Sequence, residues 1–145
     1  MTAGLSAQET KAAGKAAIGM GPEWNMNARN NFAGGAALSF DYALPYSFAA
    51  GLSFTVSANF SGFTVMEPAA AVRRYFFSDG QNGLFAQADL GCYIFFEDEE
   101  IISLFAGGLR GGYRLPLTPS LYIEPYGRIG YPFAFGIGTV VGIRI

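Results

Sequence analysis

The side chains that could do chemistry in this 145-residue chain are few, and the commonest catalytic type is missing. The sequence has no histidine, which is the most frequent general base and metal ligand in proteins. Serines such as Ser53 and Ser57 therefore have no base partner, and the single cysteine, Cys92, lies in an apolar run where we expect an inert thiol. The residues predict no catalytic site, no cofactor and no metal site.

The glycines and the acidic run agree with this expectation. The pairs Gly107-Gly108 and Gly111-Gly112 lie in an alternating segment and lack the spacing of a phosphate-binding or dinucleotide-binding loop. Four consecutive acids at 97–100 lack the spaced ligand geometry of a calcium loop, so we expect a solvated loop tip. A net charge of −2 without a basic cluster predicts no nucleic-acid partner.

The remaining side chains that could do chemistry are ten charged residues. Each lies in a segment of alternating polarity, at the positions that carry the small and polar residues. Residues of one parity lie on one face of a sheet, and ions kept from bulk water must be paired to be tolerated. The planar guanidinium of arginine suits carboxylates, and it would hold them ionised and occupied. We predict a structural interior ion network, with an ion path lined by the same groups as the alternative. The acids are Glu23, Asp41, Glu67, Asp89 and Glu124, and the bases are Arg73, Arg110, Arg114, Arg128 and Arg144.

Eight segments would position these residues. From about Ala16 the chain shows period-two alternation in segments of roughly ten residues, separated by clusters of Gly, Pro, Asn, Asp or Ser. This pattern predicts an all-β, eight-stranded antiparallel up-and-down barrel over residues 16–145. Residues 1–15 are expected to be a flexible leader or the remnant of a signal peptide. The predicted strands are 16–24, 32–42, 48–59, 63–76, 84–96, 101–115, 121–131 and 133–145.

The two faces of each predicted strand differ in size and polarity. In 133–145 one face carries Phe133, Phe135, Ile137 and Val141, whereas the other carries mainly Gly and Ala. Gly and Ala add no solubility to a wetted surface, but they leave room for a few long side chains inside a narrow barrel. Only 14% of the residues are charged, against roughly 25% in soluble domains. We therefore predict a transmembrane barrel with its apolar face in lipid; the alternative is a soluble lipocalin-like barrel.

Aromatic residues gather near the predicted strand ends, as in the interfacial girdles of membrane barrels. Packing at a turn is the alternative for each of them. The pairs Glu67-Pro68 and Glu124-Pro125 are expected to bend their strands, because proline removes a ladder donor. The predicted girdle residues are Trp24, Tyr42, Tyr46, Tyr75, Phe76, Phe77, Tyr93, Phe95, Phe96, Tyr113, Tyr122, Tyr131 and Phe133.

The last segment, 135–145 (FGIGTVVGIRI), resembles the C-terminal strand of bacterial outer-membrane barrels, which the barrel-assembly machinery reads as a signal. Segments 65–76 and 123–133 also resemble strands of the small, OmpA/OmpX-like outer-membrane β-barrel family. The resemblance covers about residues 16–145. It implies location in the outer membrane of a bacterial cell, with outer-membrane lipid and the barrel-assembly machinery as partners. The family prefers a terminal aromatic residue, whereas this chain ends in Ile145.

These features predict a non-enzymatic integral outer-membrane barrel that contributes to membrane structure or to surface interaction. The sequence does not identify an extracellular ligand. One alternative is a narrow pore or carrier for small or apolar molecules, and a second is a soluble lipocalin-like binding barrel. Short loops disfavour an adhesin, because a stable interface needs about 800 Å² per partner.

Overall fold

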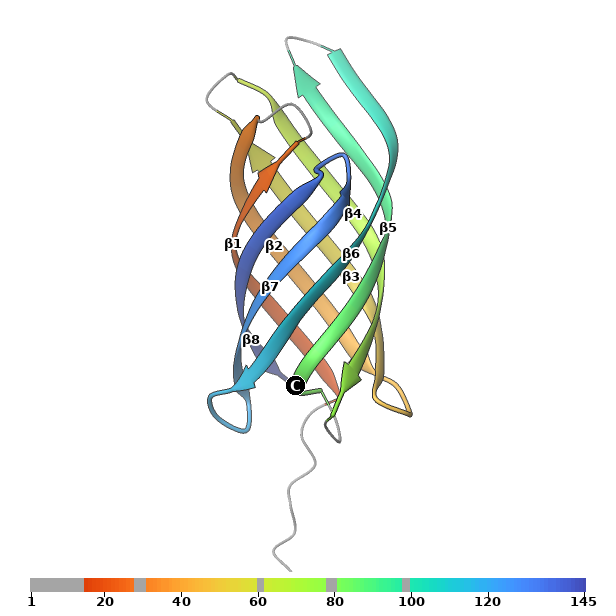
Figure 1. Ribbon diagram of the computed structural model, residues 1–145, viewed down its shortest axis with the longest axis vertical. Coiled ribbons are helices and arrows are strands. Elements are labelled where there is room, and N and C mark those ends of the chain that lie inside the picture. The colour runs from red at the N-terminus through yellow and green to blue at the C-terminus, as the bar shows by residue number, and fades with distance from the viewer. Residues whose placement is uncertain (1–14, 28–30, 60–61, 78–80, 98–99) are drawn as a thin grey trace, which may run out of the picture.

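The chain forms eight strands that pair in sequence order into a closed barrel (Figure 1). The computed structural model describes residues 15–27, 31–59, 62–77, 81–97 and 100–145. Every pairing is antiparallel, and β1 also pairs with β8, which closes the sheet. The strands are β1 (Ala16–Met26), β2 (Phe32–Ala43), β3 (Phe48–Ala58), β4 (Thr64–Phe76), β5 (Gly83–Glu97), β6 (Glu100–Pro116), β7 (Leu121–Tyr131) and β8 (Phe135–Arg144).

The barrel has two ends of different character. At one end the backbone N–H of Ile145 donates to the carbonyl oxygen of Ala16 at 2.8 Å, so the start of β1 lies beside the last residue. We call this the terminal end; it also carries the β2–β3, β4–β5 and β6–β7 connections (Figure 1). The opposite, far end carries the other four connections, and there the β5–β6 hairpin rises beyond the rest of the barrel (Figure 1).

Proline interrupts the strand ladders without shifting them. The β4–β5 pairing stops at Met66↔Ile94 and resumes at Ala69↔Gly91 in the same register, so Glu67-Pro68 forms no bulge. On the other side of the strand, Pro68 remains paired with Phe54 of β3. The missing proline N–H therefore costs a ladder hydrogen bond on one side only.

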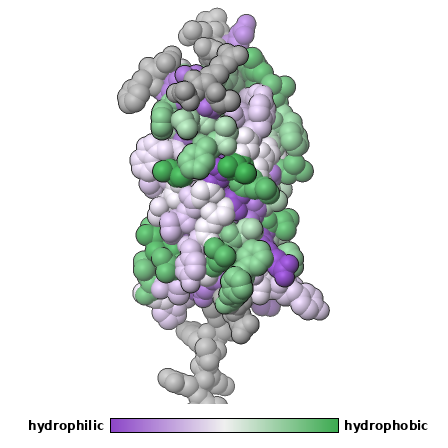
Figure 2. Space-filling view, in the orientation of Figure 1, coloured by the Kyte–Doolittle hydropathy of each residue, from purple (hydrophilic) through white to green (hydrophobic). Residues whose placement is uncertain are grey.

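The outward face of the barrel is apolar. Large side chains are well exposed on it, for example Met20 at 63%, Leu52 at 63% and Leu90 at 61%. Figure 2 shows hydrophobic side chains over much of the surface in that view. Inward positions in β3 and β8 are instead mainly small or polar, and burial alternates along both strands. The described residues form no helix that is long and apolar enough to cross a membrane.

Several aromatic residues predicted for the girdle lie inside the barrel instead. Tyr75, Tyr93, Tyr122 and Phe133 are between 0% and 8% exposed. The tyrosines share the parity of the interior ions, since Tyr75 is two residues from Arg73. Phe133 was predicted on the outward face of the last strand, but β8 begins at Phe135, so strand parity does not apply to it. The girdle residues that do face outward include Trp24, Tyr42, Tyr46, Phe77, Tyr113 and Tyr131.

Candidate functional site

The ten predicted ion-network residues all lie on the inner face of the barrel, on seven of its eight strands. Nine of them are at most 9% exposed, and Asp89 is slightly more accessible. Nine of the ten take part in ion pairs; the exception is Arg144. The pairs form two groups, one toward the terminal end and one toward the far end.

The first group centres on Glu124 of β7, which is 1% exposed. Arg73 of β4 crosses the lumen and binds Glu124 through two hydrogen bonds of 2.7 and 2.9 Å. Arg114 of β6 donates its Nε–H to Glu124 at 2.6 Å and also binds Asp41 of β2 at 2.8 and 3.2 Å. Two arginines thus neutralise two carboxylates, and because β4 and β7 lie on opposite walls, the group spans the barrel.

Aromatic rings support both arginines of this group. The guanidinium carbon of Arg73 lies 3.9 Å from the ring centroid of Phe85, and that of Arg114 lies 4.0 Å from the centroid of Tyr122. A ring face attracts a cation and excludes water from one side of the planar group. The guanidinium groups are therefore held by stacking and by carboxylates.

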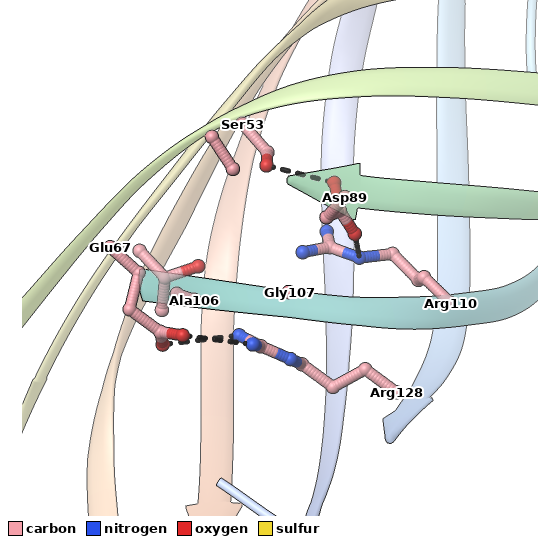
Figure 3. Close-up of a pocket in the computed structure, with 9 residues that line it drawn as sticks. Ser53, Glu67, Asp89, Ala106, Gly107, Arg110 and Arg128 are labelled. Atoms are coloured by element: carbon pink, nitrogen blue, oxygen red, sulfur yellow. Dashed lines mark hydrogen bonds and ion pairs between the residues drawn. The ribbon is translucent and has the colours of Figure 1, made fainter. Parts of the chain in front are cut away.

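The second group centres on Arg128 of β7. Its guanidinium donates to Glu67 at 2.9 and 3.2 Å and to Glu23 at 3.0 Å. Arg110 lies 4.0 Å from Glu23 and 3.6 Å from Asp89, which are longer contacts. Glu23 also accepts a 2.5 Å hydrogen bond from the Tyr126 hydroxyl. Figure 3 shows the Glu67–Arg128 and Asp89–Arg110 pairs around a small cavity.

Gln87 joins the two groups. Its amide oxygen accepts from Arg73 at 2.8 Å, and its amide nitrogen donates to Asp89 at 2.6 Å. Ser53 also donates to Asp89, at 3.0 Å. Sequence reasoning did not include Gln87 because it is uncharged, although it lies between Phe85 and Asp89 on the inward parity of β5 and could have been found by that signal.

Arg144 does not join either group. No carboxylate of a described residue lies within ion-pair distance of it. Its Nη2 group instead donates to the side-chain oxygen of Asn82 and, at 3.3 Å, to the carbonyl oxygen of Gln81. The predicted pairing of five acids with five arginines is therefore wrong at this residue. Arg144 lies at the terminal end, whereas the nearest interior acid, Asp41, is already bound by Arg114.

Only small spaces accompany these ion pairs. A cavity of about 20 Å³ is lined by Glu67, Asp89 and Arg110 among others, and one of about 10 Å³ lies beside Asp41 and Arg73. A water molecule needs roughly 10–15 Å³ of such space. These cavities hold one water molecule each at most, so the middle of the lumen is filled by side chains. Among the described residues, His, Cys, Asp and Glu form no group of three or more that could hold a metal ion.

Comparison with known proteins places the fold. No protein-family model matches the chain, and no curated protein sequence matches it. Several solved structures are similar to it over about nine-tenths of its length, and three of them are natural outer-membrane proteins. Neisserial surface protein A (NspA) is 12% identical, with 90% of this chain and 96% of that chain covered and a TM-score of 0.70. The N-terminal β-barrel domain of Pseudomonas aeruginosa OprF is 12% identical, with 90% and 97% covered and a TM-score of 0.65.

The third is Ail, the attachment invasion locus protein of Yersinia pestis, at 14% identity, with 90% and 95% covered and a TM-score of 0.53. These neighbours are small eight-stranded outer-membrane β-barrels. At such low identity the likeness is one of fold. It confirms the predicted fold class, an eight-stranded antiparallel transmembrane β-barrel.

Proposed function

We propose that the protein is a non-enzymatic integral protein of the bacterial outer membrane, whose filled barrel contributes to membrane structure and offers its far end for surface interaction. The observation that carries this proposal is the division of polarity: a wall of exposed apolar side chains encloses a lumen closed by bridged ions. Buried ions are tolerated when they are paired and hydrogen-bonded, and an apolar wall is stable in lipid. The fold shared with NspA, OprF and Ail supports the location.

The ion network supports a structural role over a conducting one. An ion crossing the barrel would have to break the Arg73–Glu124 and Arg128–Glu67 pairs, which lie at successive depths. Removing one partner from a buried pair costs about 3–5 kcal/mol. The same pairing occupies the carboxylates: Asp89, which accepts from the Ser53 hydroxyl, also accepts from Gln87 and lies 3.6 Å from Arg110. Ser57 accepts a hydrogen bond from Asn25. These contacts support a protein without turnover.

Two measurements on the purified chain test this proposal. After refolding in micelles, we expect a β-rich species that needs detergent and migrates differently on a gel when boiled. In planar lipid bilayers we expect no ion conductance above the lipid background. A stable monomer in plain buffer would contradict the membrane location and favour the lipocalin-like alternative. Discrete conductance steps would contradict the closed lumen and favour the narrow pore or carrier.

Two partners belong to the same proposal. The outward face of β8 presents Phe135, Ile137, Val141 and Ile143, each between 46% and 50% exposed, and continues to Ile145. This row, which is apolar except for Thr139, would contact outer-membrane lipid in the folded barrel. Before folding, it would serve as the signal for the barrel-assembly machinery.

A further inference from the structure

The far end of the barrel holds an apolar cup above the ion network. The cup has a volume of about 520 Å³. This lies within the range of about 300–1,000 Å³ that is usual for ligand pockets. Its walls are formed mainly by Val65, Tyr93, Phe95, Ile102, Leu104 and Phe133, from β4, β5, β6 and the connection before β8.

The cup is closed below. Val65, Tyr93 and Phe133 pack with Ala33 and Ala106 in one buried apolar cluster. The next inward residue of β4 after Val65 is Glu67, whose carboxylate is bound to Arg128. A molecule in the cup therefore meets the second ion group beneath it. The cup is a dead end rather than the mouth of a channel.

The cup is open on one side. Pairing between β6 and β7 begins at Gly107↔Tyr131, although β6 extends to Glu100. Residues 100–106 of β6 pair only with β5. The wall of the barrel thus has a gap between the upper half of β6 and the β7–β8 connection, where the β5–β6 hairpin stands clear in Figure 1.

Beside this gap, both faces of β6 carry apolar side chains. Ile102 and Leu104 have the inward parity of Ala106, yet they are 45% and 50% exposed. Ile101 and Phe105 face outward and are 69% and 65% exposed. A continuous apolar surface therefore leads from the outer wall, past the edge of β6, into the cup. Exposed apolar surface of this kind marks an interaction site.

The polar groups of the cup are uncharged. Asn27 and Asn31 line it, with the backbone N–H of Asn31 donating to the side-chain oxygen of Asn27 at 3.0 Å. The hydroxyl of Tyr93, which also lines the cup, is hydrogen-bonded at 3.2 Å to the hydroxyl of the outward-facing Tyr131. None of the lining residues carries a charge that could balance an ionic group. An occupant must therefore bury hydrocarbon and keep any charged part outside.

We propose that the cup binds the hydrocarbon chain of a membrane lipid, which enters sideways past the edge of β6. The open side continues the exposed apolar wall through Ile101 and Phe105, and most of the side chains that line the cup are aliphatic or aromatic, which suits a hydrocarbon chain better than a charged head group. Buried hydrocarbon is favoured in proportion to the apolar area removed from water. This inference goes beyond the proposed function, because a structural barrel needs no lipid-chain site at its far end.

Photolabelling tests the proposal on the full chain in phospholipid nanodiscs. The probe is a phosphatidylcholine with a diazirine at the end of one acyl chain, and the labelled residues are mapped by mass spectrometry. Leu90 and Ile137 on the outer wall give the internal reference. We expect Ile102 and Leu104 to be labelled to an extent comparable with these wall residues, whereas Val140, which is 1% exposed inside the lumen, stays unlabelled.

Two neighbouring substitutions provide a matched pair. Leu104→Trp places a large ring in the cup, and we expect it to lower cup labelling at least fivefold relative to the wall. Phe105→Trp adds the same ring on the outward face of the next residue, and we expect it to leave cup labelling unchanged. A gel shift on boiling verifies that both variants fold.

Three results would overturn the proposal. Labelling of the wall without the cup in the wild-type chain would show that lipid chains do not enter. Equal labelling of the cup in the two variants would show that the probe does not occupy it. Stronger labelling by the same diazirine chain on a water-soluble glycoside than by the bilayer lipid would show that entry is not sideways. If the wall itself stays unlabelled, the chain is not in the bilayer, and the proposed function fails as well.

Discussion

Single ion pairs decide whether the interior of this barrel is stable. Glu124 is the clearest case, because Arg73 and Arg114 both bind it and it is 1% exposed. Replacing it by glutamine leaves two buried guanidinium groups with Asp41 as their remaining carboxylate. We expect Glu124→Gln to lower the free energy of unfolding by about 3–5 kcal/mol, as for other broken buried pairs. Denaturant titration of the barrel in lipid vesicles measures this change.

Glu100 is the matched control, since the same substitution there removes an exposed carboxylate at the far end of β6. Glu100→Gln should change the free energy of unfolding by less than about 0.5 kcal/mol. If the two variants lost similar stability, or if Glu124→Gln lost less than about 1 kcal/mol, the network would not stabilise the fold in the way its geometry implies.

The membership of the network follows from strand parity, but the partners do not. Alternation places all ten predicted ions on the inner face because successive side chains of a strand point to opposite sides. Which arginine reaches which acid depends on the tilt and stagger of strands across the lumen, as for Arg73 of β4 and Glu124 of β7. A single sequence does not fix those offsets, so neither the absence of Arg144 from both ion groups nor the bridging role of Gln87 could be predicted from it.

At the scale of elements, β7 and β8 fit together through pairs of tyrosine and glycine. Tyr122 lies directly opposite Gly142, and Tyr126 lies opposite Gly138. A Cβ atom on Gly142 would overlap the Tyr122 ring and lie 2.6 Å from the carbonyl oxygen of Ile18. The small residues of β8 therefore make room for the interior tyrosines of β7. This explains why glycine is frequent on the inward face of β8.

This fit predicts opposite results for two glycine substitutions. Gly142→Ala should destabilise the barrel by about 1–3 kcal/mol through overpacking. Gly111→Ala should be neutral or stabilising by up to about 1 kcal/mol, because its Cβ would point outward, 3.8 Å from the nearest atom. Thermal gel shifts of the two variants measure the difference. Equal destabilisation would mean that the loss comes from the strand backbone rather than from the tyrosine.

The end of β8 carries a second prediction at this scale. The apolar row of β8 ends in Ile145, where the resembling family prefers an aromatic residue. We expect Ile145→Phe to speed folding into liposomes that contain purified barrel-assembly machinery. Folding into liposomes of the same lipid without the machinery should keep its rate. An equal acceleration in both would indicate a gain in lipid affinity instead of recognition.

Strand bounds were predicted to within a few residues because lipid and lumen impose a strict alternation on every strand. The prediction fails where that constraint ends. Phe133 precedes β8 and turns inward to close the base of the cup, where it packs in one cluster with Tyr93. The apolar stretch 101–105 was predicted as an ordinary wall strand, and only the pairing register reveals that this part of β6 has one neighbour.

At the scale of the whole molecule, charge is concentrated inside. In the part of the chain that the structure describes, the charged side chains assigned to the exposed surface are Lys15, Arg74 and Glu100. Salt screens interactions between exposed charges beyond about 10 Å at 0.1 M and beyond about 3 Å at 1 M, but it screens buried pairs much less. We expect the free energy of unfolding in vesicles of neutral lipid to change by less than about 1 kcal/mol between 0.05 and 1 M NaCl. A large loss at high salt would show that water and ions reach the network.

The closure of β1 on β8 means that the barrel has no intrinsic beginning. Ala16 and Ile145 are hydrogen-bonded neighbours. Apart from β1 and β8, all neighbouring strands are joined by short connections. A circularly permuted chain, joined between these two residues and reopened in the β2–β3 turn at Tyr46, should therefore reach the same set of contacts. Such a permutant would separate the stability of the barrel, which depends on the closed ring, from the proposed recognition of β8 by the barrel-assembly machinery, because another strand would then come last.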